Sequence, residues 1–500
     1  MKKLHPIMFA GTGSDVGKSI IATALCRIFL QDGYRPAPFK AQNMALNSYA
    51  TPDGLEIGRA QAVQAEAAGL PCSTDMNPLL LKPSSDMTSQ VVLNGKVIGN
   101  QSASQYFRKK GVDELRSAVN AAFDRLASRY NPIVMEGAGS ISELNLRDTD
   151  LVNLPMARHA GADVILVADI DRGGVFASVY GSIALQSEED RRRIKGIVIN
   201  KFRGDINLFK DGVKILEDIC NVPVLGVIPY YKDIHIEAED SVILAEKQLT
   251  SMRGKVNVAV ILLRHMANFT DFNLLEQDER VNLYYTNNVD EIKKADIIII
   301  PGSKNTIDDI YELRKNGVAQ ALLRARREGA TVMGICGGYQ MMGKMIYDPD
   351  GIEGSTSAMP GLGLLPTETT MSGEKITSQT TFKFMGSGAE GCTGYEIHMG
   401  RTIAADGAKG TYAAELADGR HDGFMADDRC FGTYLHGILD NAAVIDWLVG
   451  PYTDKKAAPE TTDYATFKEH QYDLLADHVR KNLDMEKLYE IMTNNEQEDD

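Results

Sequence analysis

Short apolar runs alternate with helix-like stretches along the first part of the chain. An amphipathic stretch of the helical type, "KSIIATALCRIFLQDG", follows the first run, and five more runs follow along this part of the chain. Apolar strands separated by helices predict a parallel sheet that helices cover on both faces. The six runs are "HPIMFAG", "RPAPFKAQN", "NPIVMEGAG", "ADVILVADI", "IKGIVINKF" and "VPVLGVIPY".

The same rhythm returns in a second part of the chain. Strand-like runs occur in "KVNVAVILL", "ADIIIIPGS" and "GATVMGICGG", and in the last two a glycine turn follows the strand. Ligands of open α/β sheets bind at the carboxyl ends of the strands, so these turns are the first places to look for chemistry. We expect an α/β protein of two domains, each a mostly parallel sheet covered by helices.

The boundary between the domains is predicted where the strand rhythm stops. The stretch "YKDIHIEAEDSVILAEKQLTSMRG" is charged and lacks that rhythm. We therefore expect a first domain over residues 1–235, a linker over 236–255 and a second domain over 256–450. A helical C-terminal extension over 451–500, ending in the acidic tail "NNEQEDD", completes the chain.

Composition narrows the class of partner. The chain has 500 residues and a net charge of -15, which disfavours nucleic acid and anionic membranes and favours a small-molecule substrate. Its six cysteines form no CxxC pair, as expected for a reduced, cytoplasmic protein. No run approaches the roughly 20 apolar residues that span a bilayer. The oligomeric state is left open.

The stretch "FAGTGSDVGKSIIATAL" follows an apolar strand and opens a helix, which is the context of a phosphate-binding loop. Backbone N–H groups and the helix N-terminus would hold an anion, Lys18 would reach the terminal phosphates, and Ser19 would help to hold Mg²⁺. Thr12 stands where the usual spacing has glycine. The plain alternative is a glycine-rich turn. The predicted ATP-binding loop comprises Gly11, Thr12, Gly13, Ser14, Asp15, Val16, Gly17, Lys18 and Ser19.

Three further strand ends carry polar residues. Glu136 ends the strand "PIVM" and is a candidate Mg²⁺ ligand, although a turn or N-cap acid would look the same. Lys40 ends "APF" and could steady phosphates, or it could be surface charge. Asp169, Asp171 and Arg172 follow the strand "DVILVAD" and could equally be turn formers.

Cys336 lies in "GICGGYQMMG", directly after a strand. Small neighbours permit the strained strand-to-helix turn known as a nucleophile elbow, and we expect the sulfur to point into solvent at the sheet edge. Backbone N–H groups at Gly337 and at the "PGS" turn, Gly302 and Ser303, could form an oxyanion hole. Taken alone, a buried cysteine is usually inert packing.

Several motifs together resemble known enzymes. "GTGSDVGKS" with "VMEGAGS" resembles the dethiobiotin synthetase branch of P-loop enzymes. A closer resemblance, in order and over nearly the whole chain, is to the cobyric acid synthase family. It rests on "PFKAQNMALNSY", "ELNLRDTDLVN", "DRGGVFASVYG", "PGSKNTIDD", "GICGGYQMMG", "GYEIHMGRT" and "GTYLHG".

The resemblance implies roles for single residues. Asn200 resembles the adenine-contacting asparagine of the dethiobiotin synthetase branch, and the loop with Asp169, Asp171 and Arg172 would face substrate or phosphate. For the base that activates Cys336, a strand delivers His436 into a glycine turn, while His398 competes. Similarity to glutamine amidotransferase domains favours His436. Those domains often carry a glutamate where this chain has Ile438, so the third triad member is unassigned, with another acid such as Glu396 or a backbone carbonyl as possibilities.

For the whole protein, the resemblance implies an ATP- and Mg²⁺-dependent, glutamine-hydrolysing amidoligase. It would amidate the b, d, e and g side-chain carboxylates of adenosylcobyrinic acid a,c-diamide, a corrinoid polycarboxylic acid, through acyl phosphates. Cobyrinic acid a,c-diamide synthase is one rival, disfavoured by "PFKAQNMALNS" where an acidic segment would be expected. Another is a P-loop ATPase switch with an inactive amidotransferase domain, disfavoured by the presence of Cys336 and His436.

Overall fold

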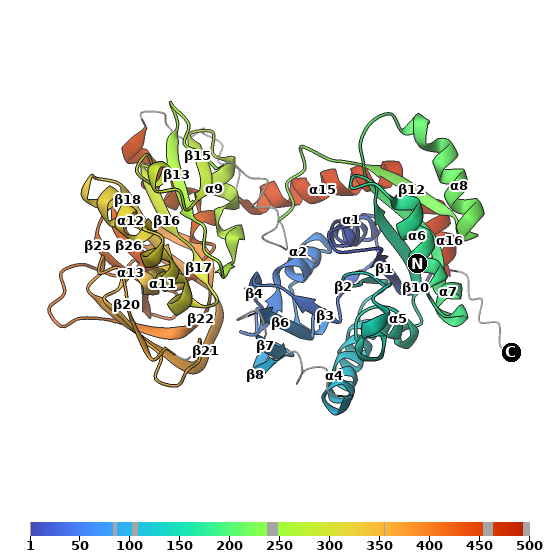
Figure 1. The fold of residues 1–500 in the computed structure, drawn as a ribbon, viewed down its shortest axis with the longest axis horizontal. Coiled ribbons are helices and arrows are strands. Elements are labelled where there is room, and N and C mark those ends of the chain that lie inside the picture. The colour runs from blue at the N-terminus through green and yellow to red at the C-terminus, as the bar shows by residue number, and fades with distance from the viewer. Residues whose placement is uncertain are drawn as a thin grey trace.

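A computed structural model describes residues 2–83, 88–102, 109–237, 249–354, 356–453 and 464–493. Residues 238–248 of the predicted linker and residues 494–500, the predicted acidic tail, lie outside these ranges. Figure 1 shows two lobes side by side, one formed by the blue and green part of the chain and the other by the yellow and orange part. None of the described helices is both long and apolar enough to cross a membrane.

The first lobe is built on a six-stranded parallel sheet. All six apolar runs predicted in the first part of the chain form its strands, and β1 lies near the middle, between β10 and β9. In spatial order the strands are β12 (Val224–Pro229), β11 (Ile194–Phe202), β10 (Asp163–Asp169), β1 (Ile7–Gly11), β9 (Ile133–Glu136) and β2 (Ala37–Phe39).

Two cores cover the two faces of this sheet. Successive strand residues point to opposite faces: Met8 belongs to one buried cluster, and Phe9 belongs to the other. The cluster around Met8 includes residues of α4 (Lys109–Ala127), α5 (Leu154–Ala160), α6 (Val175–Ala184) and α8 (Lys210–Cys220). The cluster around Phe9 includes residues of α1 (Lys18–Gln31), α15 (Tyr464–Asn482) and α16 (Met485–Thr493).

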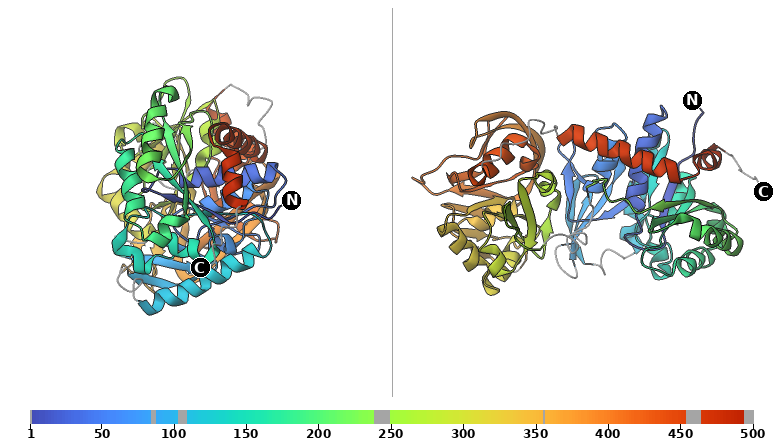
Figure 2. Two further views of the ribbon diagram at one scale, coloured as in Figure 1. Left: turned by 90° about the vertical axis from the view of Figure 1, so that its right-hand side faces the viewer. Right: turned by 90° about the horizontal axis from the view of Figure 1, so that it is seen from above.

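The C-terminal helices therefore return to the first lobe. In Figure 2, seen from above, α15 runs along that lobe. Arg27 of α1 pairs with Asp473 of α15 at 2.7 Å, and the Asp484 backbone N–H, between α15 and α16, donates to the Leu225 carbonyl of β12. The extension thus covers a face of the first sheet that α1 alone leaves open.

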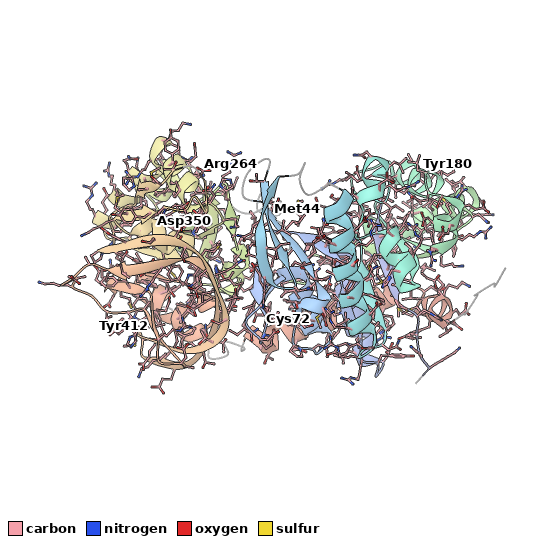
Figure 3. All side chains as sticks on the ribbon, turned by 90° about the horizontal axis from the view of Figure 1, so that it is seen from below. Met44, Cys72, Tyr180, Arg264, Asp350 and Tyr412 are labelled. Atoms are coloured by element: carbon pink, nitrogen blue, oxygen red, sulfur yellow. The ribbon has the colours of Figure 1, made fainter. Side chains whose placement is uncertain are left out.

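A smaller group of strands extends from the first lobe toward the second. The sequence analysis did not predict it. It consists of a four-stranded sheet and a hairpin: β3 (Gln42–Met44), β6 (Leu79–Pro83), β7 (Thr88–Leu93) and β8 (Lys96–Ser102), then β4 (Ser48–Ala50) and β5 (Glu56–Gly58). Figure 3 labels Met44 and Cys72 in this middle region, between the lobe with Asp350 and Tyr412 and the lobe with Tyr180.

The second lobe also contains a mostly parallel sheet of six strands, as predicted. Helices α11 (Thr306–Lys315), α12 (Val318–Arg327) and α13 (Gly337–Met342) contribute buried residues to its core, and only β25 is antiparallel. In order, the strands are β15 (Val281–Thr286), β13 (Val256–Ile261), β16 (Ile297–Ile300), β18 (Thr331–Ile335), β26 (Cys430–Thr433) and β25 (Phe424–Asp427).

A second, largely antiparallel sheet in this lobe was not expected. Its long hairpin β21 (Thr367–Phe384) and β22 (Ala389–Ala404) has many exposed polar positions, which explains why an apolar pattern missed it. The other strands are β20 (Ala358–Pro360), β19 (Met345–Tyr347), β23 (Ala414–Leu416), β24 (His421–Asp422) and β27 (Leu435–His436), and β14 (Met266–Ala267) pairs separately with β17 (Gly302–Ser303).

The remaining elements are short. The α-helices are α2 (Arg59–Ala67), α7 (Glu188–Arg193), α9 (Asn273–Gln277), α10 (Val289–Ile292) and α14 (Ala442–Val449). The 3-10 helices are η1 (Thr74–Met76), η2 (Leu144–Thr149), η3 (Ile206–Phe209), η5 (Phe269–Phe272), η6 (Ile438–Asp440) and η7 (Gly450–Tyr452).

Candidate active sites and the contact between them

The predicted phosphate loop leaves the carboxyl end of β1 and leads into α1. The Lys18 ammonium folds back onto the loop and donates to the carbonyls of Gly13 at 3.0 Å and Gly139 at 3.1 Å. Gly17 has a φ of 96°, and an added Cβ would lie 2.1 Å from Nδ2 of Asn200. Asn200 in turn donates to the Val16 carbonyl at 2.9 Å. The structure therefore brings Asn200 against the phosphate loop.

Glu136 is a meeting point of polar groups beside the loop. It is almost fully buried and ends β9. The Ser19 hydroxyl donates to Oε1 at 2.8 Å, the Lys40 ammonium donates to the same oxygen at 2.9 Å, and Gln64 donates to Oε2 at 2.6 Å. Two oxygen groups on neighbouring elements fit a hard cation such as Mg²⁺, which usually keeps waters and substrate phosphates as its other ligands. No cluster of three or more acidic, His or Cys ligands occurs among the described residues.

The loop after β10 lies at the same sheet edge. Lys201 pairs with Asp169 at 3.0 Å, Arg203 pairs with Asp171 at 2.8 Å, and the Arg172 guanidinium is 3.8 Å from Asp15 of the phosphate loop. Arg172 is largely exposed, since about 68% of its side chain is accessible. The predicted substrate loop thus contributes charged side chains beside the phosphate loop.

Most of the charged and polar side chains named above, among them Lys18, Lys40, Glu136 and Asp169, line one large cavity of about 1150 Å³. Small-molecule sites usually measure about 300–1,000 Å³, so this cavity can hold a nucleotide together with part of a second large ligand. Its lining includes Lys18, Glu136 and Asn200 and continues to Tyr464 and Tyr472 of α15. The C-terminal extension therefore forms part of the wall of the cavity.

In the second lobe, Cys336 occupies the predicted elbow between β18 and α13. Its backbone φ of 52° and ψ of -110° are strained for a residue with a side chain, as at nucleophile elbows. An added Cβ at Gly338 would lie 1.9 Å from the Ile300 carbonyl oxygen, so the turn requires glycine there. Contrary to our expectation of a solvent-facing sulfur, Cys336 is about 9% exposed. Strand β22 covers it, and the sulfur lies 3.6 Å from the Ile397 carbonyl oxygen.

His436 contacts an acid that the sequence analysis did not find. Nδ1 of His436 lies 2.7 Å from Oδ2 of Asp271, and the Gly437 N–H donates to Oδ1 of the same carboxylate at 3.0 Å. Burial lowers the pKa of His436, but the charge and hydrogen bond of Asp271 and the neighbouring Cys336 raise it to about 10. An imidazolium beside a cysteine favours the reactive thiolate.

Of the possibilities considered for the third triad member, another acid does meet Nδ1 of His436, but that acid is Asp271 and not Glu396. Glu396 accepts hydrogen bonds from Arg420 at 2.7 Å and from Ser378 at 3.1 Å, and it lies on the side of the other histidine. His398, the competing base, contacts the Gly400 carbonyl through Nδ1 at 2.8 Å and stacks on Tyr434. Asp271 lies in η5, 65 residues before Cys336 in the chain, in a segment without a recognisable motif, so no sequence signal pointed to it.

The oxyanion candidates are also brought together. An added Cβ at Gly337 would lie 2.7 Å from the Ser303 backbone nitrogen. An added Cβ at Gly302 would lie 3.3 Å from Cε1 of the His436 ring. Strand β17 pairs with β14, which precedes Asp271, so one short ribbon links the predicted oxyanion turn to the triad acid. The Ser303 hydroxyl itself donates to Asp309 at 2.6 Å and is structural.

Cys336 and His436 line a small cavity of about 50 Å³ at the contact between the lobes. Lys82 of β6, from the first lobe, lines the same cavity. Its ammonium donates to Glu56 at 2.7 Å and to the Ser48 hydroxyl at 2.8 Å, and Lys375 of the second lobe pairs with the other oxygen of Glu56. The Ser48 N–H donates to Asn268 at 2.9 Å, three residues before Asp271.

The same segment that carries Asp271 also reaches the large cavity. Phe269 and Asn273 flank Asp271 and line the large cavity, whereas Asn268 lines the small one. On the other side of His436, Tyr395 stacks on its ring at 5.3 Å between centroids and contacts Tyr49 of the first lobe at 4.6 Å. Neighbouring residues of one segment, Asn268 and Phe269, therefore line the two cavities.

Two family models match the chain. Residues 7–243 match the CobQ/CobB/MinD/ParA nucleotide binding domain, and residues 257–444 match the CobB/CobQ-like glutamine amidotransferase domain. Each match coincides with one lobe's parallel sheet.

Relatives resemble the chain over its whole length. A protein of Bacteroides fragilis named cobyric acid synthase is 69% identical over 99% of this chain and 100% of its own length. Proteins with the same name from Phocaeicola vulgatus and Parabacteroides distasonis are 68% and 58% identical, over 99% and 98% of this chain and 100% and 99% of their own lengths. The chain belongs to the cobyric acid synthase family.

Proposed function

We propose that this enzyme, an ATP-dependent and glutamine-hydrolysing amidoligase, converts the b, d, e and g side-chain carboxylates of adenosylcobyrinic acid a,c-diamide into amides. The observation that carries the proposal is the meeting of two sites: a phosphate loop facing a large cavity, and a Cys336–His436–Asp271 triad whose segment, Asn268–Asn273, contributes lining residues to both cavities. The corrinoid itself is inferred from the family.

The second lobe would release ammonia. The Cys336 thiolate attacks the side-chain amide carbon of glutamine, N–H groups of Ser303 and Gly337 stabilise the oxyanion, and imidazolium His436 gives its proton to the departing nitrogen. Water then hydrolyses the thioester, releasing glutamate and restoring the thiol. Asp271 holds the imidazole in orientation and stabilises its charge, as its 2.7 Å contact supports.

The first lobe would activate the acid. A carboxylate resists attack by ammonia, because resonance and negative charge make it a poor electrophile. Transfer of the terminal phosphoryl group of ATP to a carboxylate oxygen gives an acyl phosphate, and ammonia then displaces phosphate to form the amide. The loop residues Gly11–Ser19 would bind the phosphates, Lys18 would stabilise charge on them, and Asn200 would contact the adenine.

Glu136 and Ser19 would hold Mg²⁺, which neutralises charge on the phosphates when bound. Lys40, already 2.9 Å from Glu136, would then steady the transferred group. Asp169, Asp171 and Arg172 would contact the corrinoid or the phosphates. We further propose the domain limits 1–235 and 256–450, with the extension over 451–500 belonging functionally to the first domain because α15 lines its cavity.

Ammonia would cross between the lobes beside the segment Phe269–Asn273. Unprotonated ammonia is the nucleophile, and passage through a buried layer keeps it from becoming ammonium in water. The position of Asp271 between residues that line the two cavities supports this route.

The test is to supply the purified enzyme with ATP, Mg²⁺, glutamine and the corrinoid diamide and to follow the product mass. Four successive carboxylate-to-amide changes are expected. Amidation of cobyrinic acid at positions a and c instead would assign the enzyme to the rival diamide synthase reaction, and ATP hydrolysis without any amidation would favour the nucleotide-switch alternative.

A further inference from the structure

The small cavity beside Cys336 is unusually rich in lysine. Lys82, Lys304 and Lys375 all line it, and they come from three different elements of both lobes. Glutamine is a zwitterion, and its α-carboxylate carbon lies four carbon–carbon bonds from the amide carbon that Cys336 attacks. A site for glutamine therefore needs a cation a short distance from the sulfur.

The three lysines differ in how they are paired. Lys82 and Lys375 share the two oxygens of Glu56. The Lys304 ammonium has no hydrogen-bond or ion-pair partner among the residues that the structure describes. The nearby Glu353 accepts N–H groups of Thr306 and Ile307 at the start of α11 instead, at 2.7 and 3.3 Å.

The charge of Lys304 has an electrostatic cost in this place. Burial and then the positive charge of Lys82 lower its pKa, while Glu353, Glu56 and Cys336 oppose them. A buried cation without a partner is costly unless a ligand supplies the opposite charge. The α-carboxylate of glutamine is such a ligand.

The location of Lys304 fits that role. It follows Ser303, whose backbone N–H is an oxyanion candidate. The Cα atom of Lys304 therefore lies about 3.8 Å from the Cα atom of Ser303. Its N–H donates to the His265 carbonyl at 2.9 Å, which extends the β14–β17 ribbon and fixes its backbone. A long, unpaired side chain on a fixed backbone beside the oxyanion turn can reach the other end of the substrate.

We propose that Lys304 and Lys82 together bind the α-carboxylate of glutamine, so that the glutaminase site of the second lobe is completed by a residue of the first. The inference rests on the proposed glutaminase function. The cavity of about 50 Å³ holds only a few water-sized groups at about 10–15 Å³ each, so the lysine side chains must move when glutamine enters.

Lys82 also ties the lobes together at this point. Through Ser48 and Asn268 its network reaches the η5 segment with Asp271. Removal of Lys82 should therefore weaken glutamine binding although the residue lies outside the amidotransferase domain.

The experiment measures steady-state glutamine hydrolysis by the full-length enzyme with Lys304→Met, Lys82→Met, Lys304→Arg and the control Lys315→Met. Lys315 lies at the exposed far end of α11. Lys304→Met should raise the KM for glutamine about ten- to a hundredfold with kcat changed less than about threefold, because removal of a buried charge partner weakens binding. Lys82→Met should raise KM severalfold, Lys304→Arg should recover most of the loss, and Lys315→Met should match the unaltered enzyme.

Amidation with free ammonia should be unchanged in all four variants, since that reaction bypasses the glutamine site. An unchanged KM in Lys304→Met, or a lower kcat without a higher KM, would overturn the proposal. An unchanged KM in Lys82→Met would overturn its cross-lobe part. Failure of the underlying glutaminase function would look different: the unaltered enzyme would itself release no ammonia from glutamine.

Discussion

The two active centres are built in opposite ways. In the first lobe, the predicted phosphate site is one contiguous loop from Gly11 to Ser19, and five of its residues line the large cavity: Ser14, Asp15, Gly17, Lys18 and Ser19. In the second lobe, the reactive groups come from η5, β17, the β18–α13 turn and β27, and Lys82 reaches them from the other lobe. A phosphate-binding centre needs a run of backbone N–H groups and so can be local, whereas a triad needs three side chains that converge from different strands.

The two centres also differ in access. The nucleotide centre opens into about 1150 Å³, and the glutaminase centre into about 50 Å³ bounded by both lobes. This difference in cavity volume indicates that the synthetase centre can accept large ligands. The glutaminase centre, in contrast, depends on contact between the lobes. Each prediction below disables one centre and asks whether the other survives.

Removing the nucleophile should have the largest effect. In Cys336→Ala, glutamine hydrolysis should fall at least about ten-thousandfold, as when a triad nucleophile is removed. Amidation with free ammonia should persist at the normal rate. Product mass with each nitrogen donor measures both, and normal glutamine-dependent amidation in this variant would contradict the assignment of Cys336.

Neutralising the triad acid should have the second-largest effect on glutamine hydrolysis. In Asp271→Asn, kcat for glutamine should fall about a thousand- to ten-thousandfold, because the imidazole loses its orientation and its counter-charge. The pKa of His436, raised to about 10 by Asp271 and Cys336 despite burial, should fall toward its ordinary value.

The sign of the pH effect follows from the protonated role of His436. Activity is lost as pH rises through the pKa of the imidazolium, so the alkaline limb of the glutaminase profile should move to lower pH in Asp271→Asn. Glu396→Gln is the matched control, since Glu396 bonds Arg420 and Ser378 instead. A larger loss in Glu396→Gln than in Asp271→Asn would reverse the assignment.

In the other centre, Lys18→Ala should lower amidation about a hundred- to thousandfold with either nitrogen donor, because charge on the transferred phosphoryl group loses a stabilising cation. Glutamine hydrolysis should continue. Lys201→Ala serves as the comparison variant, because it removes a partner of Asp169 and leaves Lys18 in place. Equal loss of hydrolysis and amidation in Lys18→Ala would mean that the centres are not separable in this way.

Blocking the layer between the cavities should have the smallest effect on each half-reaction. In Asn273→Trp the indole would enter the large cavity next to Asp271. Glutamine hydrolysis and ammonia-dependent amidation should each stay within about threefold, while glutamine-dependent amidation falls about tenfold, as a small displacement at a transfer route can cost. The ratio of glutamate formed to amide formed measures this coupling, and an unchanged ratio would argue for another route.

The contrast between the centres also explains what the sequence could reveal. The six strands of the first sheet, the loop and Glu136 were predictable, because apolar strands and a nearby motif are local signals. Cys336 and His436 were candidates from glycine turns after strands, and similarity to glutamine amidotransferase domains favoured His436 over His398. Asp271 was not, because its role exists only once β14–β17 brings η5 beside His436. Lys82 was not, because a lysine in a short strand carries no signal of the lobe it will face.

The long hairpin β21–β22 was missed for a related reason. One side of the hairpin covers Cys336 and the other side is exposed to solvent, so its apolar pattern is weak. For this reason the burial of the Cys336 sulfur could not be predicted from the turn alone. Tertiary coverage, and not the elbow itself, decides how exposed the nucleophile is.

The central claim is that nitrogen released in one lobe is captured in the other without mixing with solvent. The most direct measurement supplies glutamine labelled with heavy nitrogen at its side-chain amide. Unlabelled ammonium is added at a concentration that dilutes any ammonia released into solution but does not by itself support amidation, and the mass of the amidated corrinoid is measured. The account predicts that the new amides carry the heavy label. Amides that instead carry the unlabelled nitrogen of the buffer would contradict it.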